Sequence, residues 1–106
     1  MGTLIYEGSI RVEVDDRAMA HIQIVMNTKL RRKEPFFYTW RDDASLGGGR
    51  TSIWIHPAAM LVFKYQGSRV PAINHTWLEA LVFTANSSEG MYLMPEPTNA
   101  RAMLPA

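Results

Sequence analysis

The residues of this chain whose types and spacing could perform chemistry are few. Residues 47–52 read GGGRTS, and a glycine-rich loop of this kind could bind a phosphate through its backbone N–H groups and the Arg50 guanidinium. A phosphate-binding loop usually ends in glycine, lysine and a hydroxyl residue and leads into a helix. Here the lysine is missing and strand-forming residues follow, so this loop is predicted to be a flexible connection between strands.

The three histidines do not form a recognisable metal site. His21, His56 and His75 are widely separated and fall on different predicted elements, whereas metal ligands usually lie at short helical spacings or on paired loops. The chain has no cysteine, which excludes disulfides, thiolate ligands and thiol catalysis. No G-x-S-x-G turn is present to support a serine hydrolase. We therefore predict no catalytic residue, no metal and no cofactor.

Seven basic residues make nucleic acid a candidate partner. Four close the first predicted helix and three lie on later strands and turns: Lys29, Arg31, Arg32, Lys33, Arg50, Lys64 and Arg69. Such residues provide salt-dependent phosphate contacts, and the aromatic strands could stack unpaired bases. Basic residues at a helix end are also expected from the helix dipole, and the formal net charge is only +1. Nucleic-acid binding is therefore the alternative function.

The segment 64–69, KYQGSR, resembles the K-x-D-G-x-R motif of ATP-dependent DNA ligases and related nucleotidyltransferases. In that family the lysine is the nucleophile that carries the nucleotide, a role that the resemblance would give to Lys64. Gly67 and Arg69 also match, whereas Gln66 replaces the acidic residue. On physical grounds the same segment is a strand that ends in an exposed lysine and turns at Gln66 and Gly67. A ligase-related fragment centred on Lys64 is thus a more remote alternative.

A wider resemblance extends over both predicted helices and most strands. The segments that carry it are MGTLIY, DDRAMAHIQIV, KLRR, the triple-glycine loop, SIWIHP, the 67–69 turn, WLEAL, ANSS and MPEP. Together they are similar to a small uncharacterised actinobacterial domain family, some members of which carry an ATP-dependent DNA ligase label. The resemblance implies a domain of about this length and brings no active site with it.

The apolar pattern predicts the order β-β-α-β-β-β-α-β. The predicted strands are residues 3–7, 10–14, 36–41, 51–56, 60–65 and 91–94, and the predicted helices are residues 15–33 and 75–85. Because hairpins dominate the connections, we expect an α+β fold with a mainly antiparallel sheet of about five to six strands and both helices on one face. Residues 1–97 should form one compact domain, followed by a flexible tail at 98–106.

The first predicted helix has apolar residues on two sides. At about 100° per residue a broad apolar face forms, and Arg17 and His21 lie away from it. Ala20 and Ile24 fall on the far side. Either a sheet edge or loop folds over these two residues, or a second subunit contacts them.

The aromatic strands carry more apolar surface than two short helices can cover. An uncovered sheet face or edge favours a dimer. The main prediction is therefore a non-catalytic binding or accessory module that forms a homo-oligomer, most simply a dimer. The predicted interface residues are Ala20, Ile24, Phe37 and Trp54.

The beginning of the chain and its composition bear on its location. The first residues contain no long apolar run, so we expect neither a signal peptide nor a membrane span. The absence of cysteine fits a reducing compartment. We therefore predict a cytoplasmic protein without a membrane partner.

Overall fold

Residues 1–42 and 47–98 are described by the computed structural model, which contains five strands and two helices. In chain order the elements are β1 (Gly2–Tyr6), β2 (Ile10–Val14), α1 (Asp16–Arg31), β3 (Phe36–Arg41), β4 (Arg50–Ile55), β5 (Leu61–Lys64) and α2 (His75–Ala85). The α+β class and the predicted order up to the second helix are confirmed. From residue 99 onward, the predicted tail lies outside the described residues.

The five strands form two antiparallel sheets. One sheet has the order β2-β1-β5, and the other consists of β3 and β4. The pairing is antiparallel as predicted, but the strands are divided between two sheets instead of one. The Tyr6 hydroxyl in β1 donates to the Trp54 carbonyl in β4 at 2.6 Å. A side chain, and not another strand, therefore contacts the edge of β4 at this point.

The last predicted strand, residues 91–94, is reduced to a single parallel bridge between Met91 and Tyr38 of β3. Pro95 and Pro97 follow shortly afterwards, and proline has no N–H to donate to a strand ladder. The segment leaves the edge of β3 after Met91 and continues toward the start of α2, where Glu96 and Pro97 accept from the Asn74 side chain.

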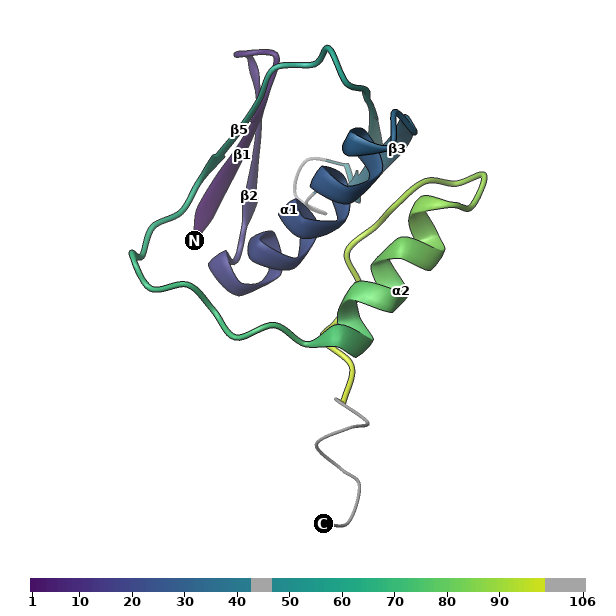
Figure 1. Ribbon diagram of the computed structural model, residues 1–106. Helices are drawn as coiled ribbons and strands as arrows, with labels where there is room; N and C mark the ends of the chain where they lie inside the picture. The colour runs from purple at the N-terminus through teal and green to yellow at the C-terminus, as the bar shows by residue number, and fades with distance from the viewer. Residues whose placement is uncertain (43–46, 99–106) are drawn as a thin grey trace.

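Helix α1 occupies the centre of the fold. Figure 1 shows it between the β2-β1-β5 sheet and α2. The Asp15 carboxylate caps its start by accepting from the N–H groups of Arg17 and Ala18, at 3.1 and 3.4 Å. The helix buries a broad apolar face that the sequence predicts correctly. Its most buried apolar residues are Ala18, Met19, Ile22, Val25 and Met26.

The helix ends at Arg31, earlier than predicted, because Lys33 adopts a positive φ of 58°. The Lys33 N–H donates to the Leu30 carbonyl and the Glu34 N–H donates to the Lys29 carbonyl, both at 3.0 Å. This pair of bonds is the Schellman arrangement, in which a left-handed residue closes the last turn.

His21 was expected to lie away from the apolar face, yet none of its surface is exposed, because α2 covers this side of α1. Its Nδ1 lies 2.7 Å from the Arg17 carbonyl, and its Nε2 lies 2.8 Å from the Asn74 N–H. A carbonyl can only accept and an N–H can only donate. The ring is therefore neutral, with its proton on Nδ1. It also packs against Trp77, with ring centroids 4.6 Å apart.

An ion pair next to His21 fixes the segment after residue 94. The Arg17 Nε and Nη2 donate to the two Glu96 carboxylate oxygens at 2.8 and 2.7 Å, and Nη1 donates to the Ala72 carbonyl at 2.7 Å. The Asn74 side-chain amide also donates to Glu96, at 3.0 Å. The hydrogen bond from Arg17 and, to a smaller extent, the one from Asn74 lower the pKa of Glu96 to about 2.

Replacing Glu96 by glutamine should lower the free energy of unfolding at neutral pH. It should also make this free energy depend less on pH in the acid range. A carboxylate with a depressed pKa contributes stability above its unfolded pKa, and this contribution is lost as the pH falls from about 5 to about 2. Urea unfolding at several pH values measures the difference. Wild type and Glu96→Gln should converge toward pH 2.

Glu79→Gln, an exposed change on α2, is the matched control and should keep the wild-type acid profile. A Glu96→Gln variant with that same profile would show that the ion pair does not contribute.

Candidate ligand-binding site

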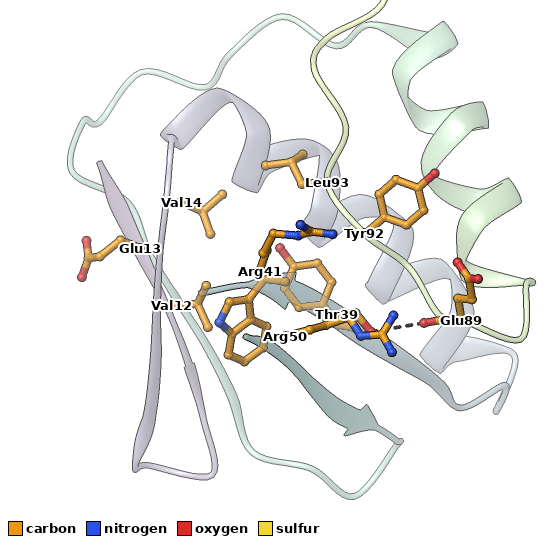
Figure 2. Close-up of a pocket in the computed structure, with 11 residues that line it drawn as sticks. Val12, Glu13, Val14, Thr39, Arg41, Arg50, Glu89, Tyr92 and Leu93 are labelled. Carbon is orange, nitrogen blue, oxygen red and sulfur yellow. Dashed lines mark hydrogen bonds between the residues drawn. The ribbon is translucent and has the colours of Figure 1, made fainter. Parts of the chain in front are cut away.

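A groove of about 530 Å³ opens where the end of the β3–β4 hairpin meets β2 (Figure 2). This volume lies within the roughly 300–1,000 Å³ range of small-molecule sites. Three segments line the groove, one each from β2, the β3–β4 hairpin and the chain after α2. The lining residues are Val12, Glu13, Val14, Tyr38, Thr39, Trp40, Arg41, Arg50, Glu89, Tyr92 and Leu93.

The floor of the groove is apolar and aromatic. Val12 and Val14 project into it from β2, whereas Glu13 points to the other side of the strand, as the alternation of a strand requires (Figure 2). Tyr38 and Trp40 come from one face of β3, with ring centroids 5.8 Å apart. Burial raises the pKa of Tyr38 to about 12, so its hydroxyl stays protonated at neutral pH and can donate.

Two arginines stand at the rim of the groove. Arg41 and Arg50 are direct cross-strand partners at the end of the hairpin, and both are exposed. Like charges at such positions repel each other. In residues 1–42 and 47–98 the ion pairs are Arg17 with Glu96 and Lys29 with Glu34, so neither rim arginine has a carboxylate partner there. An anion between the two guanidinium groups would relieve the repulsion, and their planar forks suit a carboxylate or phosphate.

The third wall, residues 89–93, is held against β3 by backbone bonds. The Met91 N–H donates to the Phe37 carbonyl and its carbonyl accepts from the Thr39 N–H, both at 2.8 Å. Gly90 has a φ of +89°, and a Cβ at this position would lie 2.7 Å from the Phe37 Cβ. Only glycine therefore allows this close approach.

The face of β3–β4 turned away from the core carries three cross-strand pairs, which we call the outer stripe. They are Phe37 with Trp54, Thr39 with Ser52, and Arg41 with Arg50. The backbone groups of the odd-numbered β3 residues bond away from β4, for example Thr39 to Met91. These pairs are therefore the non-hydrogen-bonded ones, whose side chains come closest. The two aromatic rings lie 4.8 Å apart and the two hydroxyls 2.7 Å apart.

The predicted basic residues do not gather in one place. Lys29 is only 9% exposed, and its ammonium donates to the Asn86 side chain and pairs with Glu34 at 3.2 Å. Arg31, Arg32 and Lys33 are exposed at the end of α1, next to the start of β3. Arg50 instead lies opposite Arg41 at the other end of β3, which is about 17 Å farther along the strand. The nucleic-acid site stays a prediction, and Arg50 lies far from the basic residues at the end of α1.

Lys64 lies in β5, the edge strand of the β2-β1-β5 sheet that is farthest from β2 and the groove, and Arg69 lies in the segment after β5. Lys64 is the exposed last residue of β5, and Arg69 lines a small pocket beside Ala20. The turn between them is held by the Asp16 carboxylate, which accepts from the N–H groups of Gln66 and Gly67 at 3.1 and 2.8 Å. These bonds account for the turn structurally. A nucleotidyl-transfer role for Lys64 stays a prediction.

The four predicted interface residues have different surroundings. Ala20 is buried beneath the 65–71 segment, which is the loop alternative expected from the sequence. Ile24 is exposed on α1. Phe37 and Trp54 lie together in the outer stripe and are 43% and 45% exposed. The structure therefore brings together one pair of the four.

Arg41, Trp40 and Tyr92 were not among the predicted site residues. The alternation of FFYTWR separates Trp40 from Arg41 onto two faces, but only the register of the hairpin places Arg41 opposite Arg50. Tyr92 belongs to a segment predicted as a strand, and its place in the groove follows from the single bridge at Met91.

By its fold the chain is a small α+β domain with two sheets. It belongs to the family described as Domain of unknown function (DUF7882), whose model matches residues 1–96. Membership of an uncharacterised family, as the sequence suggests, is thereby confirmed. No curated protein and no solved structure was found to match the chain.

Two further observations concern the described residues as a whole. No three His, Asp or Glu side chains among them are grouped so that they could hold a metal ion. Neither of their helices is long and apolar enough to cross a membrane.

Gly90→Ala should lower the free energy of unfolding by about 2–4 kcal/mol, because a positive φ and a backbone clash with Phe37 act together. Gly8→Ala is the matched control, since Gly8 also has a positive φ, of 73°, and no atom lies within 4 Å of the position that its Cβ would take. It should cost only about 1–2 kcal/mol, the price of the left-handed conformation. Chemical denaturation measures both. Equal losses would contradict a tight contact between Gly90 and Phe37.

Proposed function

We propose that this chain is a non-catalytic binding module whose groove takes a ligand with an anionic group and a planar apolar part. The observation that carries the proposal is the position of an arginine pair at the rim of an aromatic and aliphatic floor. Pockets that are mostly apolar, with a few convergent polar groups, are the usual form of a small-molecule site.

Each part of the groove matches one part of such a ligand. Arg41 and Arg50 supply fork-shaped donors for a carboxylate, sulfonate or phosphate. Trp40 supplies a surface for a flat ring, with the almost fully buried Tyr38 beneath it, and Val12 and Val14 add aliphatic contact. At residue 89 the backbone carbonyl accepts from the Thr39 hydroxyl at 3.2 Å, so this carbonyl already has a partner. The Glu89 carboxylate is exposed on the same wall, and an anionic group must therefore bind on the arginine side of the groove.

We place this activity in the cytoplasm as part of the same proposal. The complete lack of cysteine is compatible with a reducing compartment.

A pair of probes that differ in charge tests the groove. Anilinonaphthalene sulfonate carries a planar naphthalene ring and a sulfonate, and phenylnaphthylamine is its neutral counterpart. We expect the double variant Arg41→Gln, Arg50→Gln to bind the anionic probe at least roughly tenfold more weakly, a loss of about 1.4 kcal/mol in binding free energy. Its affinity for the neutral probe should change little. Trp40→Leu should weaken both probes. Fluorescence titration gives the affinities.

Arg31→Gln removes an exposed arginine at the end of α1 and serves as the control. Equal anionic-probe affinity in the control and the double variant would remove the arginine pair from the proposed site.

Single-stranded nucleic acid is a second candidate ligand, because it contains both a phosphate and a planar base. Its support is the same juxtaposition of Arg41 and Arg50 with aromatic rings. The end of α1 is the competing site, with Arg31 and Arg32 exposed there.

A salt titration distinguishes these two sites. For a short single strand, each lost phosphate contact should reduce the slope of log affinity against log salt by roughly 0.7. We expect this reduction in the Arg41→Gln, Arg50→Gln double variant and an unchanged slope in the Arg31→Gln, Arg32→Gln double variant. The reverse result would assign the contact to the helix end, and no binding at low salt would exclude both sites.

A further inference from the structure

We propose that the outer stripe of β3–β4 pairs with the outer stripe of a second copy of this chain. The proposal goes beyond the groove ligand. Trp54, Ser52 and Phe37 do not line the groove, whereas Thr39, Arg41 and Arg50 belong to both surfaces. The partner is a second copy because the stripe is complementary to itself.

The order of the three pairs along the ribbon produces this self-complementarity. An aromatic pair stands at one end, a hydroxyl pair in the middle and an arginine pair at the other end. Successive pairs on one face of a strand are about 7 Å apart. A two-fold axis that lies between the two copies, parallel to the face and running across the strands at the Thr39–Ser52 pair, therefore reverses the order. It places the arginines of each copy over the aromatic rings of the other.

In this arrangement both the arginine pair and the aromatic pair of each copy gain a favourable contact. Guanidinium groups stack on tryptophan and phenylalanine faces, and they are attracted by the ring quadrupole. Phe37 and Trp54 lose the solvent contact that leaves them 43% and 45% exposed. The like charges of Arg41 and Arg50 are moved over electron-rich rings. Because each copy gives and receives the same contacts, the interface is isologous and closes as a dimer.

Other occupants match only part of the stripe. An acidic peptide would pair with the arginines but would leave the aromatic rings in water. An apolar partner would cover the rings but would bury the arginines without a counter-charge, which is costly.

The geometry also sets the strength of the contact. The stripe follows strands that are about 20 Å long, and its footprint is smaller than the roughly 800 Å² per partner of a stable interface. Thr39 is almost fully buried and donates to the Glu89 carbonyl. The contact at the centre of the stripe is therefore made through Ser52, which is exposed. We therefore expect a reversible dimer that forms at tens to hundreds of micromolar, roughly the range of weak complexes.

Sedimentation equilibrium of the full chain from low micromolar to millimolar concentration tests the proposal. Wild type should change reversibly from monomer to dimer. Trp54→Ala and Arg50→Gln should each weaken the dimer at least roughly tenfold, and Arg50→Lys should recover part of the loss. Phe83→Ala is the matched control, because it removes an aromatic side chain that is 79% exposed on α2.

A chain without cysteine allows a second, positional test. A single Ser52→Cys substitution lies beside the proposed axis and should form a disulfide between copies under mild oxidation, much faster than Ser68→Cys in the exposed turn after β5. Circular dichroism checks that each variant is folded.

The proposal is overturned by a chain that stays monomeric at millimolar concentration, by a dimer that Phe83→Ala weakens as much as Trp54→Ala does, or by equal crosslinking at residues 52 and 68. Binding of the anionic probe by folded Trp54→Ala reports separately on the groove, so failure of the dimer and failure of the groove are distinguishable.

Discussion

The fold depends on the two hydrogen bonds of the His21 ring. Nδ1 donates to the carbonyl of Arg17 within α1, and Nε2 accepts from the N–H of Asn74, which caps the start of α2. A neutral, fully buried imidazole thus fixes where the second helix begins relative to the first. The same Asn74 bonds to Glu96, so the segment after α2 is positioned by the same junction.

Because the strands are divided between two sheets, the β3–β4 hairpin has one buried face and one exposed face. The β3–β4 ribbon has an inner face that packs into the core through residues such as Tyr38 and Ile53, while Phe37 and Trp54 on its other face are exposed. Near the end of the hairpin, Trp40 and Arg41 alternate between the two faces. The groove and the outer stripe can therefore share the arginine pair while they use different aromatic side chains.

Much of the fold could be predicted from local patterns. The apolar period and the acidic N-cap predict α1, Asn74 predicts the start of α2, and alternation predicts the first hairpin. The number of sheets could not be predicted, because alternation says which face of a strand is buried and does not name its neighbour. His21 was misjudged because a single stripe of apolar residues does not reveal a second helix packed on another side.

The candidate site was predictable only in part. Phe37, Trp54 and Arg50 could be selected by residue type, but their grouping with Arg41 requires the register across the hairpin. Lys29 shows the converse, since a lysine at a helix end is expected in solvent and here joins α1 to the cap of α2 through Asn86.

The chain after α2 is attached at separate points, at Met91 by β3 and at Met94 by the Trp77 indole, which donates to its carbonyl at 3.2 Å. Tyr92 and Leu93 lie between these attachments and form one side of the groove. An inserted residue here would lengthen the connection between the two attachments and change the width of the groove. The length of this short segment is therefore a variable that sets the shape of the groove separately from the packing of the helices and strands.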